Sequence, residues 1–201
     1  MSEETNGPRA RRILVINGHP DPSPEHLCAA LASAYERGAR AAGHDVSRLD
    51  VGALAFPLIR SMRDYQVSPM PPDVEKAQEA ILAADHLVMI FPIWFGSPPA
   101  VFKGFLEQAL RRGFALSSPQ SAMESVLSGH SARLIVTMGM PLPIYRWVLG
   151  GHGLSALERG LFWLTGVGPV RRTLFGGAAK VEPATAARWL AAVERLGARG
   201  S

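Results

Sequence analysis

The sequence predicts an α/β fold, a three-layer sandwich in which helices cover both faces of a five-stranded parallel sheet in the order 2-1-3-4-5. Short apolar runs alternate with segments of helical periodicity along almost the whole chain of 201 residues. Several of these runs are apolar at every position, which is typical of strands buried on both faces. A helical segment follows each run, and parallel strands require crossover connections of this kind.

The predicted elements alternate strictly from the amino terminus. The first strand is Ile13–Asn17, and its helix is Pro24–Ala42 with Gly43 as the terminating glycine. A more polar strand at Asp45–Val51 suits a sheet edge, and a long proline-containing connection, Gly52–Pro72, follows it. The remaining strands are predicted at Leu87–Phe91, Leu134–Met138 and Val170–Phe175, and the remaining helices at Asp73–Ala84, Pro99–Arg112, Leu154–Leu164 and Pro183–Leu196.

Composition limits the possible function classes. Hydrophobic residues make up 47% of the chain and charged residues 19%, as in ordinary globular proteins. Residues 1–12 are polar, without the apolar core of a signal peptide, so we expect a disordered leader before a single domain at 13–201. The apolar stretch Leu87–Phe102 is broken by prolines and a glycine, so we expect no membrane span.

The lone cysteine and the mild positive charge indicate the cellular compartment and the class of ligand. Cys28 excludes an internal disulfide and fits a cytoplasmic protein, and we interpret it as a small buried hydrophobe rather than a reactive thiol. A net charge of +4 suits an anionic small molecule. Nucleic-acid binding would need a basic stripe with interleaved aromatic residues, and the arginines are scattered instead, so we expect no nucleic-acid partner.

The predicted topology also locates the functional site. In such a sheet, ligands bind beyond the carboxyl ends of the strands, where the strand order reverses between strands 1 and 3. Three loops reach that point: Gly18–His26, Pro92–Pro98 and Gly139–Gly153. All three have an unusual composition, so the sequence predicts that the ligand is held there.

The first loop has the chemistry of a helix start. Ser23 suits the N-cap and Pro24 the first helical position. The free N–H groups of the next three residues would then form an anion site, to which His19 and His26 could add donors or positive charge. Good helix capping alone is the alternative explanation. Glu25 argues against a phosphate there unless its side chain turns away.

The other two loops are rich in aromatic residues. Trp94 and Phe95 directly follow a strand, so they belong either to the core or, beside the turn at Gly96, to a flat ligand. The third loop carries Tyr145, Trp147 and His152. An apolar loop between elements indicates a lid, a subunit contact or plain packing. We find no Rossmann fingerprint, P-loop, nucleophile elbow or metal-ligand spacing, so no metal site is expected.

Four segments carry a family resemblance: ILVINGHP, GARAAGHDVSRLDV, ADHLVMIFPIWFGSPPAVFKGFLEQAL with the following RRGFAL, and IVTMGMP. Through them the sequence resembles the flavodoxin-like NAD(P)H:quinone oxidoreductases, a family that includes related azoreductases. The resemblance covers roughly Ile13 to Gly177, and the third segment is its most specific part. It implies a flavodoxin-like fold, a bound flavin (FAD or FMN) and NAD(P)H as co-substrate, with hydride passing through the flavin to a quinone or similar acceptor.

The resemblance also implies roles for particular positions. The flavin phosphate would lie against His19, Ser23, Glu25 and His26. The isoalloxazine ring would contact Pro92, Ile93, Trp94, Phe95 and Gly96, with Thr137, Met138 and Gly139 along its other edge. Tyr145 and His152 would stabilise charge on the reduced flavin as the catalytic residues. Family members are commonly homodimers with the flavin at the interface, and the same is expected of this chain.

Two departures from the family pattern matter. The serine of the phosphate loop often stands one place later, and here Pro24-Glu25-His26 occupies that region. The T-x-T-G-x-T loop of electron-transfer flavodoxins is absent, which argues against a pure electron carrier. The alternative to quinone reduction is a flavin-binding regulatory or electron-transfer module without quinone turnover.

Overall fold

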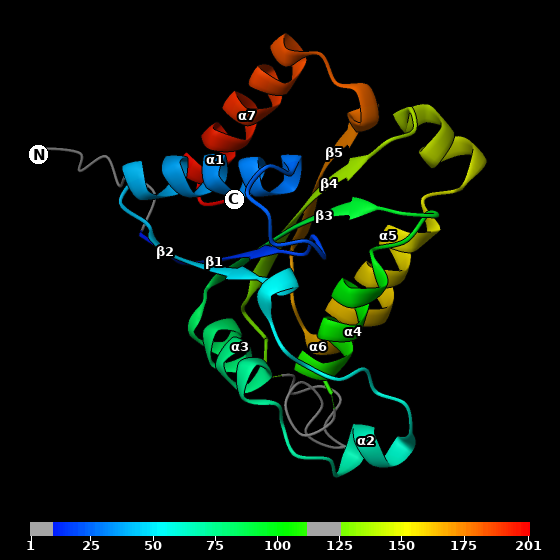
Figure 1. The fold of residues 1–201 in the computed structure, drawn as a ribbon. Helices are drawn as coiled ribbons and strands as arrows, with labels where there is room; N and C mark the ends of the chain where they lie inside the picture. The colour runs from blue at the N-terminus through cyan, green and yellow to red at the C-terminus, as the bar shows by residue number, and fades with distance from the viewer. Residues whose placement is uncertain (1–9, 112–125) are drawn as a thin grey trace, which may run out of the picture.

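A five-stranded parallel sheet in the order β2-β1-β3-β4-β5 organises the chain and confirms the predicted topology (Figure 1). The structure is a computed structural model that describes residues 10–111 and 126–201. The strands are β1 Arg12–Asn17, β2 Asp45–Asp50, β3 His86–Ile93, β4 Ser131–Met138 and β5 Val170–Gly176. Most of the predicted leader, the end of the helix predicted at Pro99–Arg112 and nearly all of the RRGFAL segment lie outside the described residues.

Helices cover both faces of this sheet. The helices are α1 Leu27–Ala41, α2 Met62–Gln66, α3 Pro72–Ala83, α4 Ala100–Ala109, α5 His152–Leu157, α6 Trp163–Thr165 and α7 Pro183–Ala198. Helices α1 and α7 pack together on one face, whereas α3, α4, α5 and α6 lie on the other (Figure 1). No helix among the described residues is long and apolar enough to cross a membrane.

Strand β3 is the centre of the sheet and is buried at all of its positions. It pairs with β1 on one side and β4 on the other, with Asn17 opposite Ile90 and Ile93 opposite Met138. Alternate residues serve the two cores: Val88 and Ile90 face α1 and α7, while Met89 and Phe91 belong to the larger cluster on the opposite face. The continuous apolar run in the sequence therefore reflects burial on both faces.

Glycines allow α1 and α7 to approach closely. A Cβ atom at Gly38 would lie 1.9 Å from the carbonyl oxygen of Glu194, and one at Gly197 would lie 2.1 Å from that of Tyr35. Both contacts are with backbone, which a side-chain rotation cannot relieve. The packing of these two helices therefore depends on the absence of side chains at both positions.

Several boundaries differ from the sequence predictions. The connection Gly52–Pro72 contains the helix α2, capped by the Ser61 hydroxyl, which accepts a hydrogen bond from the Asp64 N–H. The third loop contains a π-helical turn at Ile144–Val148, and the helix predicted at Leu154–Leu164 is interrupted by a second one at Glu158–Phe162. The glycine prediction is confirmed, because Gly43 follows α1 with a φ of 83°.

The glycine contact gives a direct test of the α1–α7 packing. Gly38→Ala should lower the free energy of unfolding by about 1–3 kcal/mol, the usual cost of overpacking, measured by urea denaturation. Gly160→Ala is the matched control, because in the described part of the chain only its own helical segment comes near a Cβ there. That variant should leave stability unchanged or raise it by up to about 1 kcal/mol through helix propensity. Equal stabilities for the two variants would contradict the close helix approach.

Candidate functional site

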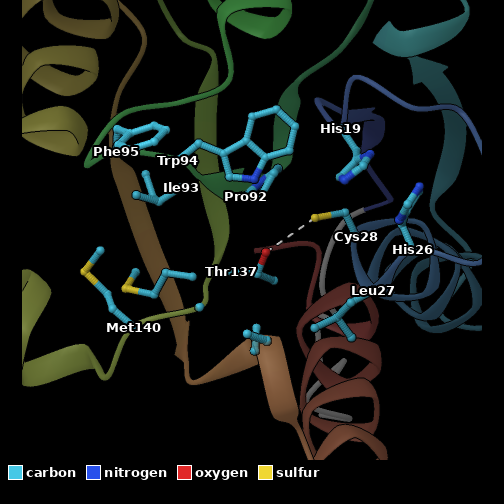
Figure 2. Close-up of a pocket in the computed structure, with 14 residues that line it drawn as sticks. His19, His26, Leu27, Cys28, Pro92, Ile93, Trp94, Phe95, Thr137 and Met140 are labelled. Atoms are coloured by element: carbon cyan, nitrogen blue, oxygen red, sulfur yellow. Dashed lines mark hydrogen bonds between the residues drawn. The ribbon is translucent and has the colours of Figure 1, made fainter.

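A cavity of about 500 Å³ opens at the carboxyl edge of the sheet, where the strand order reverses. Figure 2 shows its walls: His19 and His26 lie on one side, Met140 on the other, and Trp94 and Phe95 come from the turn after β3. The sequence-predicted residues that line it are His19, His26, Pro92, Ile93, Trp94, Phe95, Thr137, Met138 and Gly139. Ser23, Glu25, Gly96, Tyr145 and His152 are not among its lining residues.

The loop after β1 is held by its own side chains. Asp21 Oδ1 accepts the Ser23 N–H at 2.9 Å, and its other oxygen lies 2.9 Å from Nε2 of His26. The His26 contact and the Ser23 hydrogen bond hold the pKa of Asp21 below its usual value. His19 stacks on His26 with ring centroids 4.0 Å apart and meets Trp94 edge-on at 5.9 Å. These contacts join the first loop to the second across the mouth of the cavity.

The start of α1 differs from the prediction. The helix begins at Leu27 with His26 as N-cap, and no side chain caps it. Ser23 is therefore not the N-cap and Pro24 is not the first helical residue. The Ser23 hydroxyl instead accepts the Glu25 N–H at 3.3 Å within the loop. The Asp21 and Ser23 side chains form successive turns before the helix, which delays its first residue.

This late start changes which backbone groups are free. No side chain in the described stretches accepts from the N–H groups of the first helical turn, those of Leu27, Cys28 and Ala29. Leu27 and Cys28 also line the cavity, so the positive end of α1 opens into it. Glu25 is exposed and precedes the helix, and no acidic residue occupies the first turn. The electrostatic objection raised by Glu25 therefore does not apply to the helix start that the structure shows.

A two-residue turn ends β3 and forms the second wall. Trp94 and Ser97 exchange backbone hydrogen bonds of 2.9 and 3.0 Å. Phe95 and Gly96 between them have φ angles of 49° and 81°, the signs that a type I′ turn requires. Among the described residues, no acceptor takes the N–H groups of Phe95 and Gly96. The turn thus presents two backbone donors beside the cavity.

The aromatic residues of this turn are outside the core. The Phe95 side chain is fully exposed, at 108% of its reference area, and Trp94 is about half exposed at 48%. A non-glycine residue with positive φ is strained by about 1–2 kcal/mol. Phe95 keeps this conformation without gaining any packing in the chain, which is the pattern expected of functional sites. The exposure of Trp94 and Phe95 therefore rules out a core role and leaves the other interpretation, contact with a flat ligand.

The floor of the cavity comes from β4 and α1. Thr137 is almost fully buried, and its hydroxyl oxygen lies 3.6 Å from Sγ of Cys28 (Figure 2). Burial raises the pKa of Cys28 to about 11, so the thiol is protonated at neutral pH. This confirms that Cys28 is a buried hydrophobe. It also lines the cavity, a position that the sequence did not indicate.

The third loop packs on the second. A Cβ at Gly153 would lie 2.1 Å from the Gly96 carbonyl oxygen, so the start of α5 touches the turn directly. Tyr145 is buried, and its hydroxyl oxygen accepts the Leu154 N–H at 3.3 Å. Burial raises the pKa of Tyr145. His152 is exposed, with its ring over Gly150. The roles that the resemblance implies for Tyr145 and His152 remain predictions.

Some lining residues were missed by sequence reasoning. They are Leu27, Cys28, Met140, Ala178 and Ala179. Ala178 and Ala179 follow β5, whose carboxyl end lies at the same edge, so topology could have indicated this connection. Their side chains are small and apolar, so residue type alone does not indicate a binding role for this connection. In the two described stretches of the chain, no three His, Cys, Asp or Glu residues are grouped closely enough to hold a metal ion.

Comparison with known proteins places the chain among flavodoxin-like proteins. A family model described as a flavodoxin-like fold matches residues 11–199. A Haemophilus influenzae protein named as an uncharacterized NAD(P)H oxidoreductase is 28% identical over 81% of this chain and 82% of its own length. The human ribosyldihydronicotinamide dehydrogenase (quinone) is 31% identical over 81 residues, which cover 40% of this chain and 35% of that protein.

Solved structures show the same fold. A Streptococcus mutans protein superposes with a TM-score of 0.74 at 26% identity, covering 93% of this chain and 98% of that one. A Klebsiella pneumoniae protein superposes with a TM-score of 0.78 at 24% identity, covering 92% of this chain and 83% of that one. These likenesses agree with the strand order described above.

The strained turn gives the site its own test. Phe95→Gly should leave the free energy of unfolding unchanged or raise it by about 1 kcal/mol, because glycine tolerates positive φ and the lost ring is solvent-exposed. Phe102→Ala is the contrasting control, since Phe102 is fully buried and its loss should cost about 3–5 kcal/mol. Denaturation of both variants measures the difference. A clearly destabilised Phe95→Gly protein would show that the ring packs within the chain.

Proposed function

Because the chain belongs to this flavodoxin-like family, we propose that it is a flavin-dependent NAD(P)H oxidoreductase of the quinone reductase type. One observation carries the proposal: the start of α1, at Leu27 and Cys28, and the turn after β3, at Trp94 and Phe95, line the same cavity. The names of the Haemophilus and human relatives, an NAD(P)H oxidoreductase and a quinone-type dehydrogenase, support it.

The donor set fits a flavin. A flavin combines a flat ring, polar along one edge, with a chain that ends in phosphate. In the proposal, the phosphate accepts from the N–H groups at the start of α1, with His19 and His26 beside it. Ser23 and Glu25 belong to the same loop but stand before the helix start. FMN and FAD share the ring and the first phosphate, so the same residues serve both.

The ring site is built largely from backbone and apolar surface. Pro92, Ile93 and Trp94 provide one wall, and Thr137, Met138 and Gly139 the other. The chemistry that a bound flavin supplies is the transfer of hydride from NAD(P)H to an acceptor such as a quinone. With a flavin bound, the N–H groups of Phe95 and Gly96 would be the donors available to stabilise negative charge at the polar edge of the ring.

Tyr145 and His152 complete the proposed charge stabilisation. Their loop touches the turn through Gly153. The Tyr145 oxygen accepts from Leu154, which leaves its own hydrogen free to be donated. The exposed His152 ring is available to a ligand or to a second subunit. In the proposal, NAD(P)H and the acceptor would use the same open side of the cavity in turn. A cytoplasmic location, where NAD(P)H is abundant, is also part of the proposal.

A homodimer is also part of the proposal. The connection between β4 and β5 exposes several large apolar side chains: Ile144, Trp147, Val148, Leu149, Trp163 and Leu164. Trp147 is 81% exposed and Trp163 is 75% exposed. Large apolar side chains exposed together are typical of a protein–protein contact. A second copy seated on this connection removes them from water. Because the connection adjoins the Phe95 turn, the interface then runs beside the flavin.

Turnover tests the main proposal. We expect the purified protein to take up FMN or FAD and to oxidise NADH or NADPH with a soluble quinone as acceptor. Tyr145→Phe should lower kcat by about 10²-fold with flavin binding retained, the usual loss on removing one charge-stabilising donor. Tyr65→Phe is the matched control in α2, remote from the cavity, and should behave as the parent.

The outcomes separate the alternatives. Bound flavin without quinone turnover would instead indicate an electron-transfer or regulatory module. A protein that takes up neither FMN nor FAD would contradict the proposal altogether.

The dimer has a separate test. Trp147→Glu should convert the species seen by sedimentation from two chains to one, because a carboxylate would be buried in the interface. Leu82→Glu makes the same kind of change at a partly exposed position on α3 and should leave the assembly intact. A parent protein that sediments as a single chain would contradict the proposed dimer.

A further inference from the structure

A second, smaller cavity lies at the opposite, amino-terminal edge of the sheet. Its volume is about 120 Å³, and its polar lining comes from Arg11, His86, Ser131, Arg171 and Ser201. The first four precede β1 or stand at or near the starts of β3, β4 and β5, and Ser201 follows α7. The eight residues of β3 separate this cavity from the carboxyl edge by roughly 25 Å at 3.3 Å per residue. The two cavities share no lining residue.

His86, which lines this cavity, has a ring nitrogen without a partner among the described residues. Its side chain is 2% exposed, and Nδ1 lies 2.8 Å from the Ser131 hydroxyl. Its other ring nitrogen, Nε2, is buried and has no hydrogen-bond partner among the described residues. A buried polar atom without a partner costs about 1–3 kcal/mol. The atom is therefore placed for a partner that the chain itself does not supply.

Three arginines surround the histidine, and among the described residues no Asp or Glu side chain pairs with them. Arg133 on β4 is buried, and its guanidinium donates to the Thr173 hydroxyl at 2.9 Å and to the main-chain oxygen of Ser201. Arg11 donates to the Gly200 carbonyl oxygen at 3.0 Å. Arg171 has no hydrogen-bond or ion-pair partner within the described part of the chain.

The pKa values of His86 and Arg133 are lowered by burial and by the neighbouring arginines. Burial, followed by the charges of Arg11, Arg133 and Arg171, lowers the pKa of His86 to about 4. Burial lowers the pKa of Arg133 as well, and Arg171 and Arg199 add to that effect. On the α1 side, the Tyr35 hydroxyl is buried within electrostatic range of Arg11 and Arg133. No acidic side chain appears among the groups acting on His86.

We propose that this amino-edge cavity binds a small oxyanion of the phosphate class, held by Nε2 of His86 and by the guanidinium groups of Arg11 and Arg171. The volume of about 120 Å³ has room for a small tetrahedral anion. With Nδ1 accepting the Ser131 hydroxyl hydrogen, Nε2 carries its own hydrogen and donates it to the anion. Charge-assisted hydrogen bonds from arginine supply most of the binding.

The site is independent of the proposed redox activity. An anion there joins the starts of β3, β4 and β5, so its binding stabilises the folded chain by mass action. It touches no residue of the flavin cavity. Quinone turnover can therefore fail while phosphate binds here, and the reverse also holds.

Calorimetric titration of the flavin-loaded protein with inorganic phosphate in chloride buffer tests the site. We expect one phosphate per chain in the parent protein and at least tenfold weaker binding in Arg171→Gln, which removes a cation that has no described partner and so leaves the fold intact. Arg188→Gln is the matched control, an exposed arginine on α7 that bonds only Thr185 among described residues, and should bind as the parent does.

The imidazole NMR signals of His86 make the test local, because phosphate could also enter the start of α1 if flavin loading were incomplete. Phosphate should shift the His86 signals and raise the pKa of His86 in the parent, and do so far less in Arg171→Gln. The proposal is overturned by absence of binding, by equal affinity in Arg171→Gln and the parent, or by His86 signals that do not respond. The last result would mean that the oxygens of Gly200 and Ser201 already satisfy Arg11 and Arg133.

Discussion

The pairing of β3 between β1 and β4 is the constraint on which both edges of the molecule depend. All eight residues of β3 are buried, so neither its register nor its direction can shift without exposing one of the two cores. Its carboxyl end delivers the Trp94–Ser97 turn to the point where the strand order reverses. Its amino end places His86 among the arginines of the opposite edge. One strand thus aligns the proposed flavin site and the proposed anion site.

At the carboxyl edge of the sheet, the hydrogen-bond donors beside the cavity are backbone N–H groups. The start of α1 and the turn after β3 both present N–H groups that the fold fixes without any side chain. Such donors need no reorganisation when charge develops, which favours a site that carries a cofactor rather than a protein nucleophile. Neither Phe95 nor the protonated Cys28 contributes a reactive group, which agrees with a site whose chemistry comes from a cofactor.

The sequence predicted the architecture well because burial on both faces leaves a continuous apolar run for each central strand. It predicted the loop after β1 less well. Ser23 and Pro24 have the right propensities for a helix start, but Asp21 and Ser23 use their side chains in local turns, and the helix begins at Leu27. Propensity does not reveal which of two local hydrogen-bonding arrangements has the lower energy. The same limit applies to Trp94 and Phe95, whose exposure depends on the sign of φ in the turn.

The amino-edge cavity joins residues 11, 86, 131 and 171 through strand pairing alone, so no local sequence pattern indicates it.

Anaerobic reduction of the flavin-loaded protein, followed by absorbance, tests the central claim most directly. If the carboxyl-edge cavity holds the flavin for hydride transfer, one equivalent of NADH or NADPH should bleach the flavin absorbance within the time of a turnover, and added quinone should restore it. A bound flavin that neither nucleotide reduces would contradict the account.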